Sequence, residues 1–502
     1  MRRMLLNMPS WRAAILSGIL VGLSYHWFPL GFLAYIGFIP IFHSWIKNNT
    51  KNNFFSGYIF GVIYNVISNY WIGANSGAES IIVIFSLISA VLYLSIFWGI
   101  AGALSSLVKK KPNVYYMLPF LIVSLEWIRS FGPLGFTWGN LALTQTNLMP
   151  ILQFNDYAGS YIVAFYIITI NVLLYYSIFE KGFERKTTVF IILICSIVLI
   201  GGWIRIIEYQ SYQYDNEIKV AIIQPNIDPN DKWDVASRKN TLNFMDSLHN
   251  HAISLSPDII LFPETALPVY LRLNKKIRNN YQMRVNNSNI PILIGTVDRR
   301  LDSIGRKLYY NSTMFMQPDK KFEMYDKIHL VPFAEYDLLP NLFHPLGKLN
   351  VNLNRGIFVG GDDYKIFIKD ELSFSDLICY ESTLPRYARR FVKKGAELLM
   401  IQANDGWLGK TAGPYQHFEH ARLRAIENRV PIIRSGNTGI SGVVYPTGEV
   451  KKKVPLGEEA VFLEKIPYGD AGSFYSEYGN IFSVICFILF LFIGPILSCV
   501  EL

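Results

Sequence analysis

The chain has 502 residues, of which 51% are hydrophobic and 15% aromatic, and its formal net charge is +9. A single soluble domain of ordinary composition is excluded, because the chain is too long and too apolar for one. The charge does not indicate nucleic-acid binding, since no nucleic-acid motif is present and many lysines and arginines lie beside apolar runs. The composition predicts a polytopic membrane protein.

Apolar stretches of about 20 residues, long enough to cross a bilayer as a helix, recur along the chain. We expect about eight α-helical spans: 13–30, 31–46, 54–73, 80–107, 114–131, 157–178, 188–206 and 480–499. The second run is short enough to be re-entrant or tilted instead. The predicted domains are an N-terminal membrane domain of about seven helices (1–206), a polar block (207–479) and a C-terminal transmembrane helix (480–502).

The short loops between these runs differ in charge. Lysines and arginines precede the first span and follow the second, fourth and sixth, whereas the loops near 73–79 and 132–150 contain none. By the positive-inside rule, both termini are cytoplasmic and the polar block lies on the opposite side. In a bacterium this places a multi-pass protein in the inner membrane, with the polar block in the periplasm.

The polar block has the length and pattern of a complete α/β domain, with strand-like runs that lead to polar residues. Three of these are Glu264, Lys327 and Cys379. Because strand ends of α/β domains collect catalytic groups from distant parts of the chain, we expect the three to meet. The thiolate would be the nucleophile and Glu264 its base. Lys327 would stabilise the thiolate and, with the backbone N–H of Tyr380, an oxyanion.

The motifs FPETALP (262–268), YDKIHLVPFAE (325–335) and ICYES (378–382) carry these residues in the order Glu, Lys, Cys. The order resembles the nitrilase superfamily, which implies a four-layer αββα sandwich. Because membrane spans enclose the block, the chain resembles the apolipoprotein N-acyltransferase family within that superfamily. Two stretches of the apolar region, 22–40 and 135–145, are similar to that family as well.

The resemblance implies a ping-pong acyl transfer. Cys379 would take a fatty acyl chain from a phospholipid, usually from its sn-1 position, as a thioester. The acceptor would be the α-amino group of the diacylglyceryl-cysteine at the N-terminus of an apolipoprotein. Phospholipids and diacylglyceryl apolipoproteins are the expected partners, no cofactor or metal is expected, and a monomer is favoured.

The resemblance also implies supporting or substrate-binding roles for Glu335, Tyr380, Glu381 and Trp233. Plainer interpretations are surface salt bridges for the two glutamates and packing anchors for the two aromatic residues. In the fifth span, Glu126 and Arg129 are spaced i,i+3. They form either a mutually satisfied pair or a site where Arg129 holds a phospholipid phosphate.

His417 and His420 lie one turn apart in a segment that predicts an amphipathic helix packed on the sheet, with a solvated charged face. They do not predict a metal site, because the commoner zinc spacing is i,i+4 and no third ligand is near in sequence. The stretch 340–360 predicts a mobile arm. In it, Leu342, Phe343, Leu346 and Leu349 would touch the bilayer or the acyl chains and open a lateral path to Cys379.

Two other functions remain open at this point. A membrane-tethered nitrilase or amidase would use water as the acceptor, and it shares the thioester with the acyltransferase, so the triad does not separate them. A non-catalytic lipid carrier is the other alternative. The intact triad argues against it, since a binding module has no need for a thiol, a base and a cation together.

Overall fold

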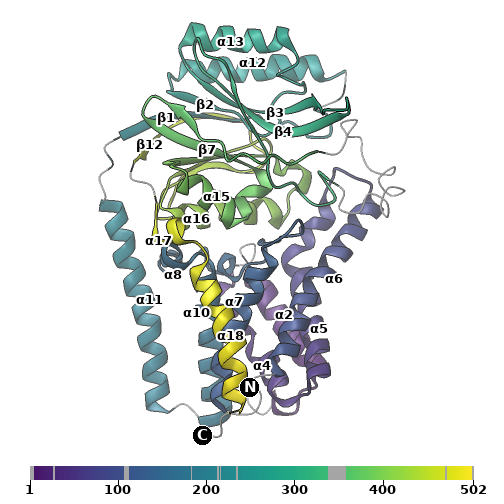
Figure 1. The fold of residues 1–502 in the computed structure, drawn as a ribbon, viewed down its shortest axis with the longest axis vertical. Coiled ribbons are helices and arrows are strands. Elements are labelled where there is room, and N and C mark those ends of the chain that lie inside the picture. The colour runs from purple at the N-terminus through teal and green to yellow at the C-terminus, as the bar shows by residue number, and fades with distance from the viewer. Residues whose placement is uncertain are drawn as a thin grey trace. The chain divides into compact units, whose positions relative to one another are not determined.

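The computed structural model of the chain comprises two compact units (Figure 1). One contains Met1–Gly73, Val83–Ser211 and Tyr478–Leu502, and the other contains Ala74–Ile82 and Tyr212–Glu477. The structure describes residues 5–25, 29–106, 112–181, 184–211, 214, 216–232, 234, 236–336, 358–469 and 472–499. Outside these ranges lie Trp233 and the four apolar residues of the predicted arm, Leu342, Phe343, Leu346 and Leu349.

The first unit is helical. Its main helices are α2 (Ser10–Leu23), α3 (Ala34–Gly37), α4 (Ile39–Lys47), α5 (Thr50–Asn69), α6 (Ser80–Ser105), α7 (Leu118–Arg129), α8 (Met149–Leu152), α9 (Asn155–Ala158), α10 (Tyr161–Tyr176), α11 (Arg185–Ser211) and α18 (Ile481–Cys499). Within the described ranges, three helices are long and apolar enough to cross a membrane: Ser80–Ser105, Tyr161–Glu180 and Arg185–Ser211. The apolar helical region is thus confirmed, and the count of eight spans stays a prediction.

The second predicted span, 31–46, is divided. It consists of a 3-10 turn, Gly31–Leu33, followed by α3 and α4. Pro40 lies in the first turn of α4. Because proline has no backbone N–H, it can begin a helix but cannot continue the hydrogen bonding of the preceding one. The proline therefore accounts for the break after α3.

Glycines allow α5 and α6 to pack closely. A Cβ atom at Gly57 would lie 2.2 Å from the carbonyl oxygen of Trp98, and one at Gly102 would lie 2.1 Å from that of Asn53. Small residues at such contacts let two helix backbones approach, which is the usual source of helix association where lipid removes the hydrophobic driving force.

The second unit contains two six-stranded sheets. The first sheet has the order β12-β1-β2-β3-β4-β5, and its strands are β12 (Ala460–Tyr468), β1 (Asn216–Gln224), β2 (Ile259–Leu261), β3 (Ile292–Leu301), β4 (Lys307–Met316) and β5 (Glu323–Asp326). The second has the order β11-β10-β9-β8-β7-β6, and its strands are β11 (Val450–Val454), β10 (Ser441–Val444), β9 (Ile432–Gly436), β8 (Leu398–Ala403), β7 (Leu372–Ile378) and β6 (Phe367–Lys369).

Helices cover the outer face of each sheet, so the unit has four layers (Figure 1). The helices α12 (Arg238–Ser254) and α13 (Lys275–Ser288) connect the parallel strands β1, β2 and β3, and α15 (Pro385–Lys393) and α16 (Ala412–Asn428) connect β7, β8 and β9. Parallel pairing requires such crossovers, and it buries both faces of the strands. The expected nitrilase-like α/β domain is therefore confirmed.

Polar side chains join the two sheets. Gln402 on β8 donates hydrogen bonds to the carbonyl oxygen of Phe262 (2.8 Å) and to that of Leu293 on β3 (3.3 Å). Thr313 on β4 donates to Asp376 on β7. These bonds tie β8 to the end of β2 and to β3, and β4 to β7. Cys379 follows β7 directly, and Glu264 lies three residues after the end of β2.

Candidate active site

Cys379 occupies a sharp turn at the end of β7, where it begins the 3-10 helix Cys379–Thr383. Its φ is +52°, in the left-handed region that residues with a side chain rarely adopt. Such a conformation costs about 1–3 kcal/mol and persists only where the surroundings hold it. The nucleophile predicted from the sequence is therefore held in a strained backbone conformation.

Glu381 is one of the groups that hold this turn. Its buried carboxylate accepts hydrogen bonds from the backbone N–H groups of Ile378 (2.9 Å), Ile328 (2.7 Å) and His329 (3.0 Å), and from the hydroxyl of Tyr325. The plainer interpretation of Glu381 as a surface salt bridge is wrong, because a carboxylate can remain buried when several donors satisfy it. Glu381 joins the cysteine turn to the loop that carries Lys327.

Glu264 and Lys327 are buried, and with the partly buried Glu335 they form a charged group. The Lys327 Nζ lies 2.8 Å from Glu335 Oε2 and 3.9 Å from Glu264 Oε1. Asn311 on β4 donates to both carboxylates, at 2.7 Å to Glu264 and 3.0 Å to Glu335. One ammonium is thus shared between two carboxylates, and the interpretation of Glu335 as a surface pair is wrong because its cation, Lys327, is only 1% exposed.

A glycine lets Glu264 reach this position. A Cβ atom at Gly295 on β3 would lie 2.4 Å from the carbonyl oxygen of Pro263 and 2.7 Å from the Cα of Glu264. The backbone before the glutamate therefore rests directly on β3. A side chain at Gly295 would force this backbone, and Glu264 with it, to move.

The electrostatics keep the thiol of Cys379 protonated at rest. Burial raises its pKa well above the usual value, the nearby Glu264 carboxylate raises it further, and Lys327 lowers it by less. The thiol hydrogen-bonds Glu264, whose own pKa is raised, first by burial and then by Glu335, against the lowering effect of Lys327. Lys327 keeps its charge because the two carboxylates outweigh burial and raise its pKa. The arrangement is a protonated thiol beside a carboxylate, with a cation next to both.

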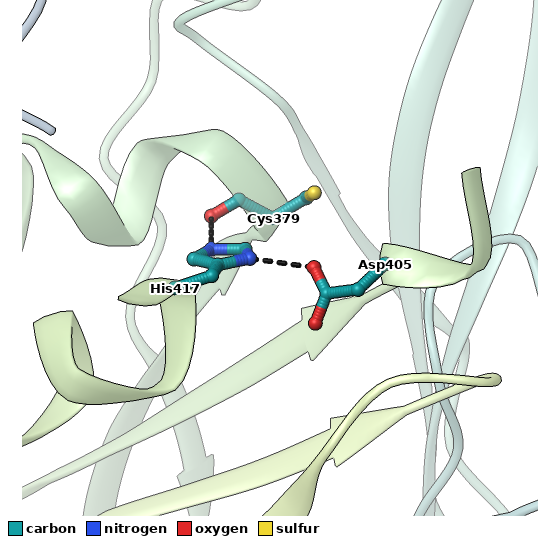
Figure 2. A group of neighbouring side chains, drawn as sticks. All are labelled: Cys379, Asp405 and His417. Atoms are coloured by element: carbon teal, nitrogen blue, oxygen red, sulfur yellow. Dashed lines mark hydrogen bonds and ion pairs between the residues drawn. The ribbon is translucent and has the colours of Figure 1, made fainter. Parts of the chain in front are cut away.

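Cys379, Asp405 and His417 form a second group of chemistry-bearing residues (Figure 2). His417 Nε2 lies 3.1 Å from the carbonyl oxygen of Cys379, and His417 Nδ1 lies 2.6 Å from Asp405 Oδ1. In Figure 2 the sulfur points away from the imidazole, although it lies within 4.8 Å of a ring nitrogen, and the hydrogen bond of His417 is to the carbonyl oxygen. Asp405 Oδ2 also accepts a hydrogen bond from Arg434 Nη2 at 2.6 Å, and this guanidinium would repel a metal cation.

The charges within this second group balance one another. Burial raises the pKa of Asp405, but Arg434 and His417 outweigh it and lower that pKa to about 2. Burial, together with Arg434, lowers the pKa of His417. Asp405 is therefore ionised at every physiological pH.

The helix α16, which carries His417 and His420, differs from its prediction. Its charged residues are buried, and Arg424 pairs with Glu427 at 2.8 Å instead of facing solvent. The expectation of a solvated charged face is wrong, because α16 packs between α15 and the strands of the second sheet, where internal pairs can satisfy its charges.

The remaining predicted residues lie in different places. Tyr380 is buried, and its ring stacks on that of His329 with centroids 5.7 Å apart.

Arg129 lies in the helical unit, 3.9 Å from Glu126. Its Nη2 donates to the carbonyl oxygen of Gly139 at 2.9 Å, while Glu126 accepts from the N–H of Leu141 at 3.0 Å.

Sequence reasoning missed Asn311, Asp405 and Arg434. Asp405 lies in the stretch NDGWLG (404–409) and Arg434 lies on β9, and the sequence predicted a role for neither residue. Asn311 lies within a strand, and no local pattern marks it as the donor shared by two carboxylates.

The comparisons with known proteins cover both units. The family model described as carbon-nitrogen hydrolase matches residues 219–475, and the one described as apolipoprotein N-acyltransferase N-terminal domain matches 17–173. The chain is 30% identical over 492 residues to the apolipoprotein N-acyltransferase of Geobacter metallireducens, covering 94% of this chain and 92% of that one.

A second relative is the apolipoprotein N-acyltransferase of Rickettsia prowazekii, which is 31% identical over 83% of each chain. Among solved structures, an amidase from Nesterenkonia sp. is similar over 50% of this chain and 90% of that chain, with 17% identity and a TM-score of 0.38. The two matching family models and these full-length relatives agree, and the chain belongs to the apolipoprotein N-acyltransferase family, within the carbon-nitrogen hydrolases.

Proposed function

We propose that this protein transfers a fatty acyl chain from a membrane phospholipid to the α-amino group of the N-terminal diacylglyceryl-cysteine of apolipoproteins, through a thioester on Cys379. Family membership supports lipoprotein N-acylation as the activity. The observation that supports the thioester route is the thiol of Cys379, hydrogen-bonded to the Glu264 carboxylate within reach of the Lys327 ammonium.

In the first half-reaction, Glu264 accepts the thiol proton while the sulfur attacks the ester carbonyl carbon of the phospholipid. The electron pair of the C=O bond moves to its oxygen, and Lys327 and the N–H of Tyr380 stabilise this oxyanion. The oxyanion then re-forms the carbonyl as the C–O bond to glycerol breaks. Glu264 gives its proton to the glycerol oxygen, and a lysophospholipid leaves.

In the second half-reaction, the neutral α-amine attacks the thioester carbonyl and gives a proton to Glu264. The C–S bond breaks, an amide forms, and the proton returns from Glu264 to the sulfur. Each step balances without a cofactor, because the ester supplies the chemical energy. Glu335 holds Lys327 in place through both steps.

We further propose the topology of a bacterial inner-membrane protein. Residues 1–206 form the membrane domain, 207–479 the periplasmic catalytic domain and 480–502 the last of about eight spans, with both termini in the cytoplasm. The distribution of lysines and arginines among the short loops supports this orientation. A reporter enzyme that is active only in the periplasm should be inactive when fused to residue 502 and active when fused after residue 479.

The decisive test is intact mass spectrometry of the purified full chain after incubation with phospholipid alone. We expect a hydroxylamine-sensitive adduct of one fatty acyl group, and none in Cys379→Ala. Adding a diacylglyceryl peptide should then discharge the adduct onto the peptide. Discharge onto water at the same rate, with or without peptide, would support the hydrolase instead, and the absence of any adduct in a folded protein would favour the lipid carrier.

A further inference from the structure

The carbonyl oxygen of Cys379 is anchored by two side chains. The hydroxyl of Ser382 donates to it at 2.7 Å, and His417 Nε2 lies 3.1 Å away. A carbonyl oxygen only accepts hydrogen bonds, so the contact with His417 places a proton on Nε2. Ser382 Oγ and His417 Nε2 also lie 2.9 Å apart, so the two side chains and the carbonyl oxygen of Cys379 all contact one another.

A chain of buried charges fixes the imidazole of His417 from behind. Its Nδ1 lies 2.6 Å from Asp405 Oδ1 and 3.0 Å from Arg434 Nη2. The Arg434 guanidinium is in turn held by Asp405 and by the carbonyl oxygen of Ile440, at 3.0 Å. Nδ1 therefore has an acceptor, Asp405, and a donor, Arg434, beside it. The imidazole has a hydrogen-bond partner whether Nδ1 is protonated or not. All three side chains are buried, which limits their freedom to turn.

The planarity of the peptide bond carries this restraint to the other side of the backbone. The carbonyl of Cys379 and the N–H of Tyr380 belong to one peptide unit, which is trans, as are all the described ones. In a trans peptide the C=O and N–H bonds point in opposite directions within a rigid plane. Fixing the carbonyl oxygen on His417 therefore fixes the direction of the Tyr380 N–H. Figure 2 shows the sulfur on the side away from His417.

We propose that His417, held by Asp405 and Arg434, is a positioning residue that aims the N–H of Tyr380 at the oxyanion formed on the carbon bonded to Cys379. This inference rests on the proposed acyl transfer, in which that N–H is an oxyanion donor. In this role His417 acts through its hydrogen bond to the carbonyl oxygen of Cys379, and not on the reacting atoms themselves. Donation to the carbonyl also polarises the peptide unit, which strengthens its N–H as a donor.

Two reactions of the Cys379 thiol distinguish a positioning role of His417 from a role as the base or as a packing residue. Acylation by an ester passes through an oxyanion, whereas alkylation by iodoacetamide is a direct displacement at carbon and needs no oxyanion donor. Loss of the base would slow both reactions. Loss of the aimed N–H slows acylation alone.

The experiment uses the purified full chain in detergent with phosphatidylethanolamine as the ester. For His417→Leu, we expect acyl-enzyme formation to slow by about 10- to 100-fold, because misplacing a catalytic donor by about 1 Å has an effect of that order. Iodoacetamide labelling of Cys379 should change by less than about twofold. His417→Gln keeps an N–H near the position of Nε2 and should recover part of the acylation rate.

His420→Leu is the matched control, since His420 lies one turn further along α16 and is equally buried. It should leave the ratio of the two rates unchanged even if the thermal midpoint falls. If His417→Leu does not fold, Ser382→Ala removes the other donor to the same oxygen and should lower acylation selectively, by about threefold.

Equal slowing of both reactions in His417→Leu, or unchanged acylation, would overturn the positioning role. A wild-type protein that alkylates but never acylates would instead contradict the proposed function.

Discussion

Two buried acid–base pairs in this protein have the same separation and different surroundings. In the helical unit, Arg129 Nη2 lies 3.9 Å from Glu126 Oε1, and in the α/β unit Lys327 Nζ lies 3.9 Å from Glu264 Oε1. The partners of the first pair include backbone groups, the carbonyl of Gly139 and the N–H of Leu141. The second pair meets side chains that can exchange protons, Cys379 and Glu335.

Burial and distance are therefore alike in the two pairs, and only the groups around them support the proposal that the pair in the α/β unit is catalytic. A charged pair whose remaining hydrogen bonds go to backbone groups contributes to stability, because backbone groups do not exchange protons. A pair beside a thiol and a second carboxylate has coupled pKa values, which general acid–base catalysis requires. Substitutions in the two pairs should therefore separate activity from stability.

The largest effect is expected for Glu264→Gln. The amide keeps the size of the side chain but cannot accept the thiol proton, so acyl-enzyme formation should slow by about 10²- to 10⁴-fold at neutral pH. The rate of adduct formation by mass spectrometry measures this loss. A thermal midpoint close to that of the wild type would show that the fold is intact, and a rate within about tenfold of the wild type would exclude Glu264 as the base.

Lys327→Met is expected to affect both activity and stability. Acylation should slow by about 10²- to 10³-fold, because one donor to the oxyanion is lost. Removing the cation also leaves the buried carboxylate of Glu264 and the partly buried one of Glu335 uncompensated, and breaking a buried ion pair destabilises a protein by about 3–5 kcal/mol. Thermal unfolding followed by circular dichroism should show a lower midpoint, which Glu264→Gln should not.

Glu335→Gln should have a smaller effect on the rate and a distinctive effect on its pH dependence. Activity requires ionised Glu264, so the acid limb of the pH–rate profile follows the pKa of Glu264. That pKa is raised. The negative charge of Glu335 contributes to that rise. Without this charge the pKa of Glu264 falls, and the acid limb should move to lower pH.

The rate at the plateau of Glu335→Gln should fall by about tenfold, because Lys327 is held less firmly. A pH–rate profile of acyl-enzyme formation tests both expectations. An acid limb that stays in place or moves to higher pH would contradict this account of the charges.

How much of the site could be predicted depends on the kind of signal that each residue leaves. Glu264, Lys327 and Cys379 each follow a strand-like run, and their order along the chain, within motifs that resemble a known superfamily, singles them out. Glu381 lies two residues after the cysteine, but three of its four donors come from a distant segment, residues 325–329. Its buried position follows from the packing of β7 against the Lys327 loop, which no local pattern encodes.

The helix α16 illustrates the opposite limit. Its arginines, glutamates and histidines have the composition of a solvated face, and the amphipathic prediction follows from that composition. The structure buries them because Arg424 and Glu427 satisfy each other and His417 meets Asp405 and the Cys379 carbonyl. Pairing across distant segments reverses the expectation, and a single sequence does not show such pairs.

The smallest effect on activity is expected in the helical unit, with Arg129→Gln. If Arg129 serves the fold, the KM for phospholipid should stay within about twofold of the wild type, and the thermal midpoint should fall because Glu126 loses its cation. If it holds a lipid phosphate, the KM should rise by about tenfold or more, since charge-assisted bonds to phosphate are strong.

The double variant Glu126→Gln/Arg129→Gln is the control. It removes both charges, so it should regain stability relative to Arg129→Gln, whereas a phosphate site would stay lost. The hydrogen bond from Arg129 to the carbonyl oxygen of Gly139 favours an unchanged KM. That result would leave the pair of Lys327 and Glu264 as the one that acts in catalysis.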